Sequence, residues 1–340
     1  MLNTVYRLVA PRTFEPVVVS QDTAGKVVVR PTHLSICNAD QRYYQGMRSR
    51  AVLDRKLPMA LIHEGIGRVV SDDAGIFQSG DRVVMLPNAP VERDEFIAEN
   101  YLRTSRFCGS GFDGFMQEAM VLRPERVVLL PTGIDPEVAS FTELVSVATH
   151  AISRFDKIAH GRRERIGVWG DGNMGYVVSL LLRIRYPGAQ IVVFGRNESK
   201  LRDFTFVDET HLVDDVDDAA FVDHAFECAG GEGSVAAVEQ IIDCINPEGT
   251  VSLLGVSENN VPINTRMVLE KGLRLFGSSR SGREDFEATV QLYRAHPEAV
   301  AYLESLIFES REVRGIADIS AAFEADARKP MGKTVIKWNV

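Results

Sequence analysis

The spacing of apolar and polar residues divides the chain into a β-rich first part and a second part in which strands and helices alternate. Up to about residue 131, short valine-rich runs are separated by turns that contain Gly, Pro, Asp or Ser, which is typical of a β-barrel-like domain. A polar stretch at 88–106 predicts a long loop. Strands are expected at 17–19, 26–30, 66–70, 82–86 and 126–130.

The second part begins with a predicted helix from an N-cap at Asp135 to about Phe155. Apolar runs at 166–169 and 191–194 then flank a glycine-rich turn and a helix. Strand and helix continue to alternate, which predicts a parallel sheet of about six strands in a doubly wound α/β domain. The later strands are expected at 225–228, 249–255 and 273–279, with a helix that ends near 245.

The glycine-rich turn has the Gly-x-Gly-x-x-Gly pattern of a dinucleotide-binding fold. The first glycine permits the tight turn, the second lets the backbone approach a pyrophosphate, and the third lets the helix pack closely on the strand. The phosphates are expected at the positive end of the helix. The residues assigned to this phosphate site are Gly170, Gly172, Asn173, Met174 and Gly175.

The residues after the second strand of this unit indicate which dinucleotide is bound. NAD-binding folds usually have an acidic residue there, which binds the ribose 2′-hydroxyl. This chain instead has Gly195, which leaves room, followed by the cations Arg196 and Lys200. Because cations suit a 2′-phosphate better than a hydroxyl, we predict NADP as the cofactor. The alternative is that Arg196 and Lys200 are solvated charges at the start of a helix.

These patterns predict two domains in the 340 residues. We place an NADP-binding Rossmann domain at 148–283 and assign 1–147 together with 284–340 to the β-rich catalytic domain. The closing segment is expected to form helices at 285–296 and 318–327 and a strand at 333–338 that returns to the first domain.

Composition limits the class of partner. Lys plus Arg total 38 against 47 Asp plus Glu, a net charge of −9, and no basic tail or stripe is present, so nucleic acid is not expected as a partner. The four cysteines show no paired spacing, which favours a reducing compartment over a disulfide framework. Because we find no signal-peptide pattern and no apolar run that could span a membrane, we expect a cytoplasmic enzyme.

Three potential metal ligands, Cys37, His63 and Glu143, lie in the first part of the chain. They are too far apart in sequence to form a local zinc finger and would have to converge through the fold, as the ligands of a catalytic zinc do. Each residue also has a structural interpretation. Cys37 could be a small buried side chain, His63 a core histidine, and Glu143 a charge in the first turn of a helix.

The arrangement as a whole resembles the zinc-dependent medium-chain dehydrogenases, the alcohol and polyol dehydrogenase family. The resemblance rests on the Cys-x-x-Asp at Cys37, the His-Glu at His63, the glutamate at 143, the following glycine pattern and the closing Gly-Lys-Thr-Val at 332–335. It implies a GroES-like catalytic domain beside the Rossmann domain. It also implies that Cys37, His63 and Glu143 hold a catalytic zinc, with Glu64 as a displaceable fourth ligand or a close neighbour.

The chain departs from the family pattern in three ways that bear on the zinc content and the proton donor. The stretch at 88–111 has only Cys108 where the family often has four cysteines for a structural zinc, so we predict one catalytic zinc per chain and no structural zinc. Ile62 replaces the glycine that usually precedes the histidine, and Ala39 replaces the hydroxyl that often begins the proton relay. The proton donor is therefore open, and its candidates are His33, Tyr43 and Tyr44.

Longer shared phrases resemble one branch of the family, the bacterial ribulose-5-phosphate reductases. They occur at 57–65, 100–102, 113–117, 169–173 and 277–282. The resemblance implies that NADPH reduces D-ribulose 5-phosphate to D-ribitol 5-phosphate, a precursor of CDP-ribitol for wall teichoic acid or capsule. It also implies a homodimer that works beside a ribitol-5-phosphate cytidylyltransferase.

This reaction would take place where the zinc and the nicotinamide meet in a cleft between the domains. For the substrate phosphate, the candidate cations are Arg280, Arg42 and Arg283. Two other functions remain open. One is an NADP-dependent polyol or alcohol dehydrogenase with an unphosphorylated substrate, and the other is a non-catalytic nucleotide-binding partner of the cytidylyltransferase.

Overall fold

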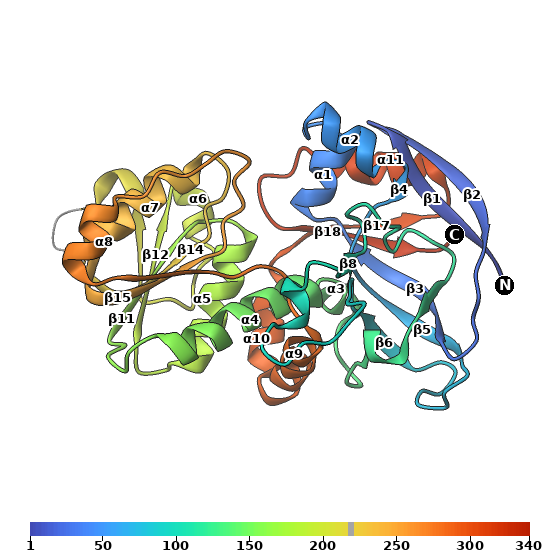
Figure 1. Cartoon of the computed structure of the whole chain (residues 1–340), viewed down its shortest axis with the longest axis horizontal. Helices are drawn as coiled ribbons and strands as arrows, with labels where there is room; N and C mark the ends of the chain where they lie inside the picture. The colour runs from blue at the N-terminus through green and yellow to red at the C-terminus, as the bar shows by residue number, and fades with distance from the viewer. Residues whose placement is uncertain (217–220) are drawn as a thin grey trace. The chain divides into compact units, whose positions relative to one another are not determined.

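The computed structural model describes residues 1–216 and 221–340. The chain forms two compact units (Figure 1). Unit 1 consists of Met1–Ser146 and Ser281–Val340, and unit 2 of Val147–Arg280. Each unit has its own buried hydrophobic core. Within the described ranges, no helix has both the length and the apolar character needed to cross a membrane.

Unit 1 is built on β-sheets, as the valine-rich runs predicted. Its largest sheet has seven strands in the order β10-β6-β5-β3-β18-β17, with β9 paired to β3, and a second sheet has the order β2-β1-β4. The last strand, β18, pairs antiparallel with β3, so the end of the chain returns to the β-rich part as expected. The strands are β1 Leu2–Ala10, β2 Thr13–Ser20, β3 Val27–Ser35, β4 Met59–Ala60, β5 Glu64–Asp72, β6 Arg82–Met85, β7 Asn88–Ala89, β8 Arg106–Phe107, β9 Met120–Leu122, β10 Val127–Leu129, β17 Ile307–Val313 and β18 Lys333–Trp338.

Short helices connect and cover these strands. Asp135 caps a helix as predicted, because its carboxylate accepts hydrogen bonds from the backbone N–H groups of Glu137 and Val138. The predicted continuous helix is instead two helices that are separated at Phe141. The helices are α1 Asn38–Tyr44, α2 Arg50–Lys56, α3 Pro136–Ser140, α4 Thr142–Ile158, which continues into unit 2, α9 Arg283–Ala295, α10 Pro297–Glu304 and α11 Ile316–Asp326, with 3-10 turns η1 Glu99–Tyr101 and η2 Pro124–Arg126.

Unit 2 contains one parallel sheet of six strands in the order β13-β12-β11-β14-β15-β16. This is the doubly wound order of a dinucleotide-binding domain, which confirms the predicted α/β fold class. Trp169 and Phe194 stack at 4.0 Å between ring centroids in its core. Its elements are β11 Arg165–Trp169, α5 Asn173–Arg185, β12 Gln190–Gly195, α6 Glu198–Leu201, β13 Glu209–Leu212, η3 Val213–Asp215, β14 Val222–Glu227, α7 Gly233–Cys244, β15 Ile245–Leu253, α8 Thr265–Lys271 and β16 Arg274–Gly277.

Candidate active site

Unit 1 gathers the predicted metal ligands from three elements. Cys37 is the N-cap residue of α1, immediately after β3. His63 directly precedes β5, whose first residue is Glu64. Glu143 lies in the first turn of α4. Side chains at the ends of strands and the starts of helices are held by the surrounding sheet, so the fold can fix ligands that are remote in sequence.

These residues form two overlapping sets that share His63. The ligand atoms of Cys37, Asp40 and His63 lie within 4.8 Å of one another, and so do those of His63, Glu64 and Glu143. His63, Glu64 and Glu143 are buried, and Cys37 is half-buried. One thiol, one imidazole and buried carboxylates are the donor types that zinc prefers, so the residues fit a zinc ion.

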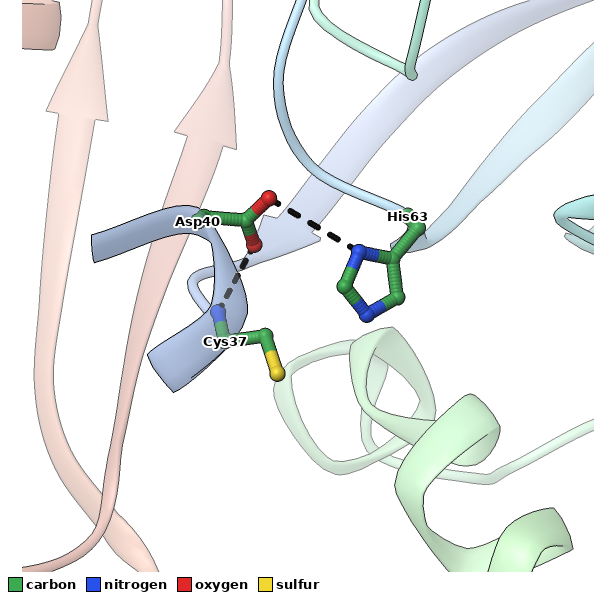
Figure 2. Close-up of side chains that lie close together, drawn as sticks. All are labelled: Cys37, Asp40 and His63. Carbon is green, nitrogen blue, oxygen red and sulfur yellow. Dashed lines mark hydrogen bonds and ion pairs between the residues drawn. The ribbon is translucent and has the colours of Figure 1, made fainter. Parts of the chain in front are cut away.

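Asp40 organises this centre from behind the ligands (Figure 2). Its side chain is fully buried and accepts hydrogen bonds from the backbone N–H groups of Cys37 and Ile62, both at 3.0 Å. The same carboxylate lies 3.7 Å from Nδ1 of His63. In Figure 2 the Cys37 sulfur and the other ring nitrogen of His63 lie on the side away from Asp40. A carboxylate on the second nitrogen of a metal-binding histidine is a common support of metal sites.

The buried charges of the centre shift the pKa values of its members. Burial lowers the pKa of His63, but the charge of Asp40 and the hydrogen bonds to Asp40 and Cys37 raise it well above its ordinary value. Burial also raises the pKa of Glu143 to about 7; His63 lowers it and Glu64 raises it further. Burial makes the charged form of these carboxylates unfavourable when no cation is present. Because a bound cation stabilises that charged form, the site is suited to bind a cation.

Glu64 has a cationic partner that the sequence did not reveal. Lys333, the first residue of β18, lies with its Nζ 2.7 Å and 2.9 Å from the two carboxylate oxygens of Glu64. Both side chains are buried. Burial lowers the pKa of Lys333, but the charges of Glu64 and Cys37 raise it above its ordinary value. Because Lys333 neutralises Glu64, the pair adds little net charge to the centre formed by Cys37, His63 and Glu143.

Ile62 adopts an unusual backbone conformation. Its φ angle is 66°, in the left-handed region that favours glycine, and its side chain is fully buried. This accounts for the glycine that relatives of the wider family usually have at this position. The hydrogen bond from the Ile62 N–H to Asp40 helps to hold the strained residue in place, directly before the predicted metal ligand His63.

We expect an Asp40→Asn variant to bind zinc about 10- to 100-fold more weakly, because it loses the negative charge behind His63 and one backbone hydrogen bond. Zinc affinity would be measured by competition with a chelator. Asp54→Asn is the matched control, since Asp54 is exposed and pairs with Arg50. Unchanged zinc affinity in Asp40→Asn would mean that this carboxylate serves the fold and not the metal.

Unit 2 contains a cavity of about 410 Å³ at the carboxyl ends of its strands. The predicted cofactor residues Gly170, Gly172, Gly195, Arg196 and Lys200 are among its lining residues. The other predicted residues form the first turn of α5, whose N-cap is Gly172. At Gly175 a β-carbon would lie only 1.9 Å from the carbonyl oxygen of Gly170, so this close contact of helix and strand requires glycine.

The surroundings of Gly195, the last residue of β12, explain why this position has glycine and not an acidic residue. A β-carbon at Gly195 would lie 2.7 Å from the β-carbon of Asp171, so the position has no room for an acidic side chain. One carboxylate oxygen of Asp171 accepts hydrogen bonds from the N–H groups of Arg196 and Asn197, both at 2.8 Å, and from the Asn197 side chain at 3.0 Å. Asp171 thereby fixes the loop that presents Arg196 to the cavity, a role that its sequence context alone did not indicate.

The remaining candidates occupy different places. Arg280 is half-buried, belongs to unit 2 and has a φ angle of 59°. Arg42 is half-buried on α1. The guanidinium of Arg283 donates to Glu287 and to the carbonyl groups of Pro124 and Val127.

The three candidate proton donors also differ. The Tyr44 hydroxyl donates to Glu324 at 2.9 Å, and burial raises its pKa to about 12. His33 lies on β3, and burial lowers its pKa. Tyr43 is buried on α1, and its hydroxyl accepts a hydrogen bond from Lys56 at 2.9 Å. The sequence singled out Tyr43 but gave no sign of Lys56.

Two family models match parts of the chain. Residues 23–132 match the alcohol dehydrogenase GroES-like domain, and residues 181–295 match the zinc-binding dehydrogenase domain. The chain is 56% identical over 343 residues to the ribulose-5-phosphate reductase of Bacillus spizizenii, and all of both chains is covered. It is 51% identical to ribulose-5-phosphate reductase 1 of Staphylococcus aureus over 99% of both chains.

A solved structure extends the likeness to three dimensions. The crystal structure of S. aureus TarJ in complex with NADPH has a TM-score of 0.90 with this chain, at 47% identity over 99% of both chains. The sequence comparison and the structural comparison therefore each match this chain over nearly its full length. The chain belongs to the zinc-binding dehydrogenase family, within the group that contains the ribulose-5-phosphate reductases.

Proposed function

We propose that this protein catalyses the NADPH-dependent reduction of D-ribulose 5-phosphate to D-ribitol 5-phosphate. The observation that carries the proposal is the match at 51% to 56% identity, over nearly the whole chain, to proteins named ribulose-5-phosphate reductases. The NADPH complex of TarJ supports the choice of cofactor, because its fold matches this chain along its length.

Unit 2 would bind the cofactor. The pyrophosphate would lie at the N-terminus of α5, where backbone N–H groups and the helix dipole favour negative charge. Arg196 and Lys200, which line the cavity, would hold the 2′-phosphate, and Asp171 would keep the Arg196 loop in place. Asp214 and Glu232 also line this cavity, so the two cations are needed to make it attractive to an anion.

Unit 1 would supply the catalytic centre. We propose that Cys37, His63 and Glu143 hold one zinc ion per chain, with no structural zinc. When bound there, zinc would supply Lewis-acid polarisation of the substrate carbonyl. Asp40 keeps the imidazole of His63 oriented, and Lys333 balances the charge of Glu64 beside the ligands. Glu64 remains our candidate for a ligand that the substrate oxygen displaces.

The phosphate ligands, the proton donor, the oligomeric state and the partner are also proposals. Arg280, Arg42 and Arg283 remain candidates for the substrate phosphate, and His33, Tyr43 and Tyr44 for the proton donor. The family resemblance supports a homodimer and an association with a ribitol-5-phosphate cytidylyltransferase, and the cysteine spacing supports a cytoplasmic location. A product that is a sugar-alcohol phosphate fits a following activation step for teichoic acid or capsule synthesis.

Product analysis tests this function. We expect incubation with D-ribulose 5-phosphate and NADPH to yield D-ribitol 5-phosphate and NADP in equal amounts, because one hydride reduces one carbonyl group. The product would be identified by NMR against authentic pentitol phosphates. A different pentitol phosphate, or NADPH oxidation without a pentitol phosphate, would contradict the proposal.

A further inference from the structure

Lys56, the last residue of α2, is a cation that donates hydrogen bonds to two hydroxyl groups. Its Nζ donates to the Tyr43 hydroxyl at 2.9 Å and to the Ser110 hydroxyl at 2.8 Å. Its side chain is half-buried. Among the residues that the structure describes, no carboxylate lies within ion-pair distance of this ammonium group. A partly buried charge held only by neutral hydroxyl groups keeps much of its attraction for an anion.

A second cation lies over the same aromatic ring. The guanidinium of Arg48 is 5.2 Å from the centre of the Tyr43 ring, and the Lys56 ammonium is 5.6 Å from it. Both side chains are half-buried. The face of the ring attracts the guanidinium of Arg48, whereas the Lys56 ammonium lies beyond the Tyr43 hydroxyl, to which it donates. An anion that contacts both cations would be attracted by two positive charges, in a protein whose net charge is −9.

This cluster adjoins the metal centre through two segments. The first is 107–110: the Phe107 ring lies 5.3 Å from the His63 ring, and Ser110 binds Lys56. Within this segment, a β-carbon at Gly109 would lie 3.6 Å from Nδ1 of His63. The contacts therefore run from the metal-binding histidine to Lys56 within a few residues.

The second segment is α1, which begins beside Cys37 and carries Tyr43 near its end. Six residues of helix extend about 9 Å along the axis. That length is comparable to the span of a five-carbon sugar phosphate from its C2 carbonyl to its phosphate. A carbonyl at the metal centre would thus leave the phosphate in reach of the cluster.

We propose that Lys56, with the hydroxyl groups of Tyr43 and Ser110 and the guanidinium of Arg48, binds the phosphate group of the substrate. This inference rests on the proposed function and names the residues that make it selective for a phosphorylated ketose. Lysine, hydroxyl groups and arginine are the side chains that proteins use to bind phosphate. Here they come from α1, the α1–α2 connection, α2 and the segment 107–110.

The Lys56→Met variant tests the inference, because it keeps the length of the side chain and removes the charge. We expect its KM for D-ribulose 5-phosphate to rise by about 10- to 100-fold, which is the usual effect of losing a charged hydrogen bond. Turnover of unphosphorylated D-ribulose and the Kd for NADPH are expected to stay within about twofold of wild type. Lys56→Arg should recover part of the loss because it restores the charge.

Two further variants separate binding of phosphate from a structural role. Tyr43→Phe keeps the ring and both cations, so its KM should rise less than that of Lys56→Met. Lys26→Met is the matched control, since Lys26 precedes β3 and Cys37 follows it, about 30 Å further along the sheet. The inhibition constant of D-ribitol 5-phosphate, compared with that of ribitol, gives a second measure in each variant.

The outcomes distinguish this inference from the proposed function. An unchanged KM in Lys56→Met would overturn the phosphate site, and so would equal losses of kcat on both ketoses, which would indicate a role in proton transfer or folding. In either case the reductase activity of the wild-type protein would stand. If the wild-type protein does not reduce D-ribulose 5-phosphate, the proposed function fails and this inference fails with it.

Discussion

Replacing Cys37 with alanine is expected to abolish bound zinc and to lower kcat by about 10³-fold or more. Cys37 supplies the thiol of the buried donor set that converges on His63, and its removal leaves too few ligands to hold the ion. The loss of Lewis-acid polarisation costs several kcal/mol of transition-state stabilisation, which corresponds to this fall in rate. Zinc content by mass spectrometry and steady-state rates would be measured on the same preparation.

Cys108→Ala is the matched control for this variant. Cys108 lies within the segment 107–110 that contacts His63 but belongs to neither described ligand set, and burial raises the pKa of its thiol to about 12. We expect this control to keep its zinc and its activity. NADPH binding should persist in both variants, because the cofactor cavity is lined by unit 2 alone. Full zinc occupancy in Cys37→Ala would refute the proposed metal centre, and two zinc ions per wild-type chain would refute the prediction of a single zinc.

An Arg196→Asp variant is expected to lower the preference for NADPH over NADH by about 10³-fold. The substitution removes a charged hydrogen-bond donor from the cavity and introduces a carboxylate that repels a 2′-phosphate. The same carboxylate can accept a hydrogen bond from a ribose 2′-hydroxyl. Position 196 is the one to change, because Asp171 leaves no room for an acidic side chain at Gly195. The ratio of kcat/KM for the two cofactors measures the effect.

Arg202→Asp serves as the control for charge alone. Arg202 is largely exposed, pairs with Glu198 and is not among the residues that line the cavity. We expect it to keep the cofactor preference of the wild-type protein. If Arg196→Asp also kept its full preference for NADPH, then Arg196 would be only a solvated charge at the start of α6.

The sequence predicted the fold well where one local pattern determines an element. The apolar run at 166–169, the glycine turn and the helix after it appear as β11 and α5, and the sheet has the expected doubly wound order. Elements with weaker patterns were not anticipated. β17 is a largely polar strand at the edge of its sheet, and α10 follows α9 after a single residue, with Pro297 at its first position. Such elements depend on the neighbours against which they pack.

The candidate site was predictable in its residue types but not in its contacts. Cys37, His63, Glu64 and Glu143 were identified because the family pattern marks them, and the structure brings them into two sets that share His63. Asp40 and Lys333 also lie in the family pattern, but the pattern does not indicate which ligands they support. Lys333 reaches Glu64 across 269 positions, and a lysine in a terminal strand has no local feature that indicates a buried ion pair. Their assignment as zinc ligands stays a prediction.

The same limit applies to the cations near the metal centre. Arginines were predicted as phosphate ligands because the geometry of the guanidinium group suits a phosphate. Lys56 was not predicted, because it lies in a short charged helix with no motif. Only the fold shows that Lys56 turns toward Tyr43 and Ser110. Local sequence therefore indicated the chemistry that is needed, and tertiary structure indicated a different residue to supply it.

The decisive experiment for the reduction of D-ribulose 5-phosphate measures the rate of NADPH oxidation by the purified protein. The rate with D-ribulose 5-phosphate is compared with the rate with D-ribulose. We predict a kcat/KM for the phosphate ester that is at least about 10³-fold higher, because a site built to bind a polar group discriminates strongly against a substrate that lacks it. Equal rates on the two ketoses would indicate a general polyol dehydrogenase. If NADPH is oxidised with neither D-ribulose 5-phosphate nor D-ribulose as the substrate, the reductase function itself is contradicted.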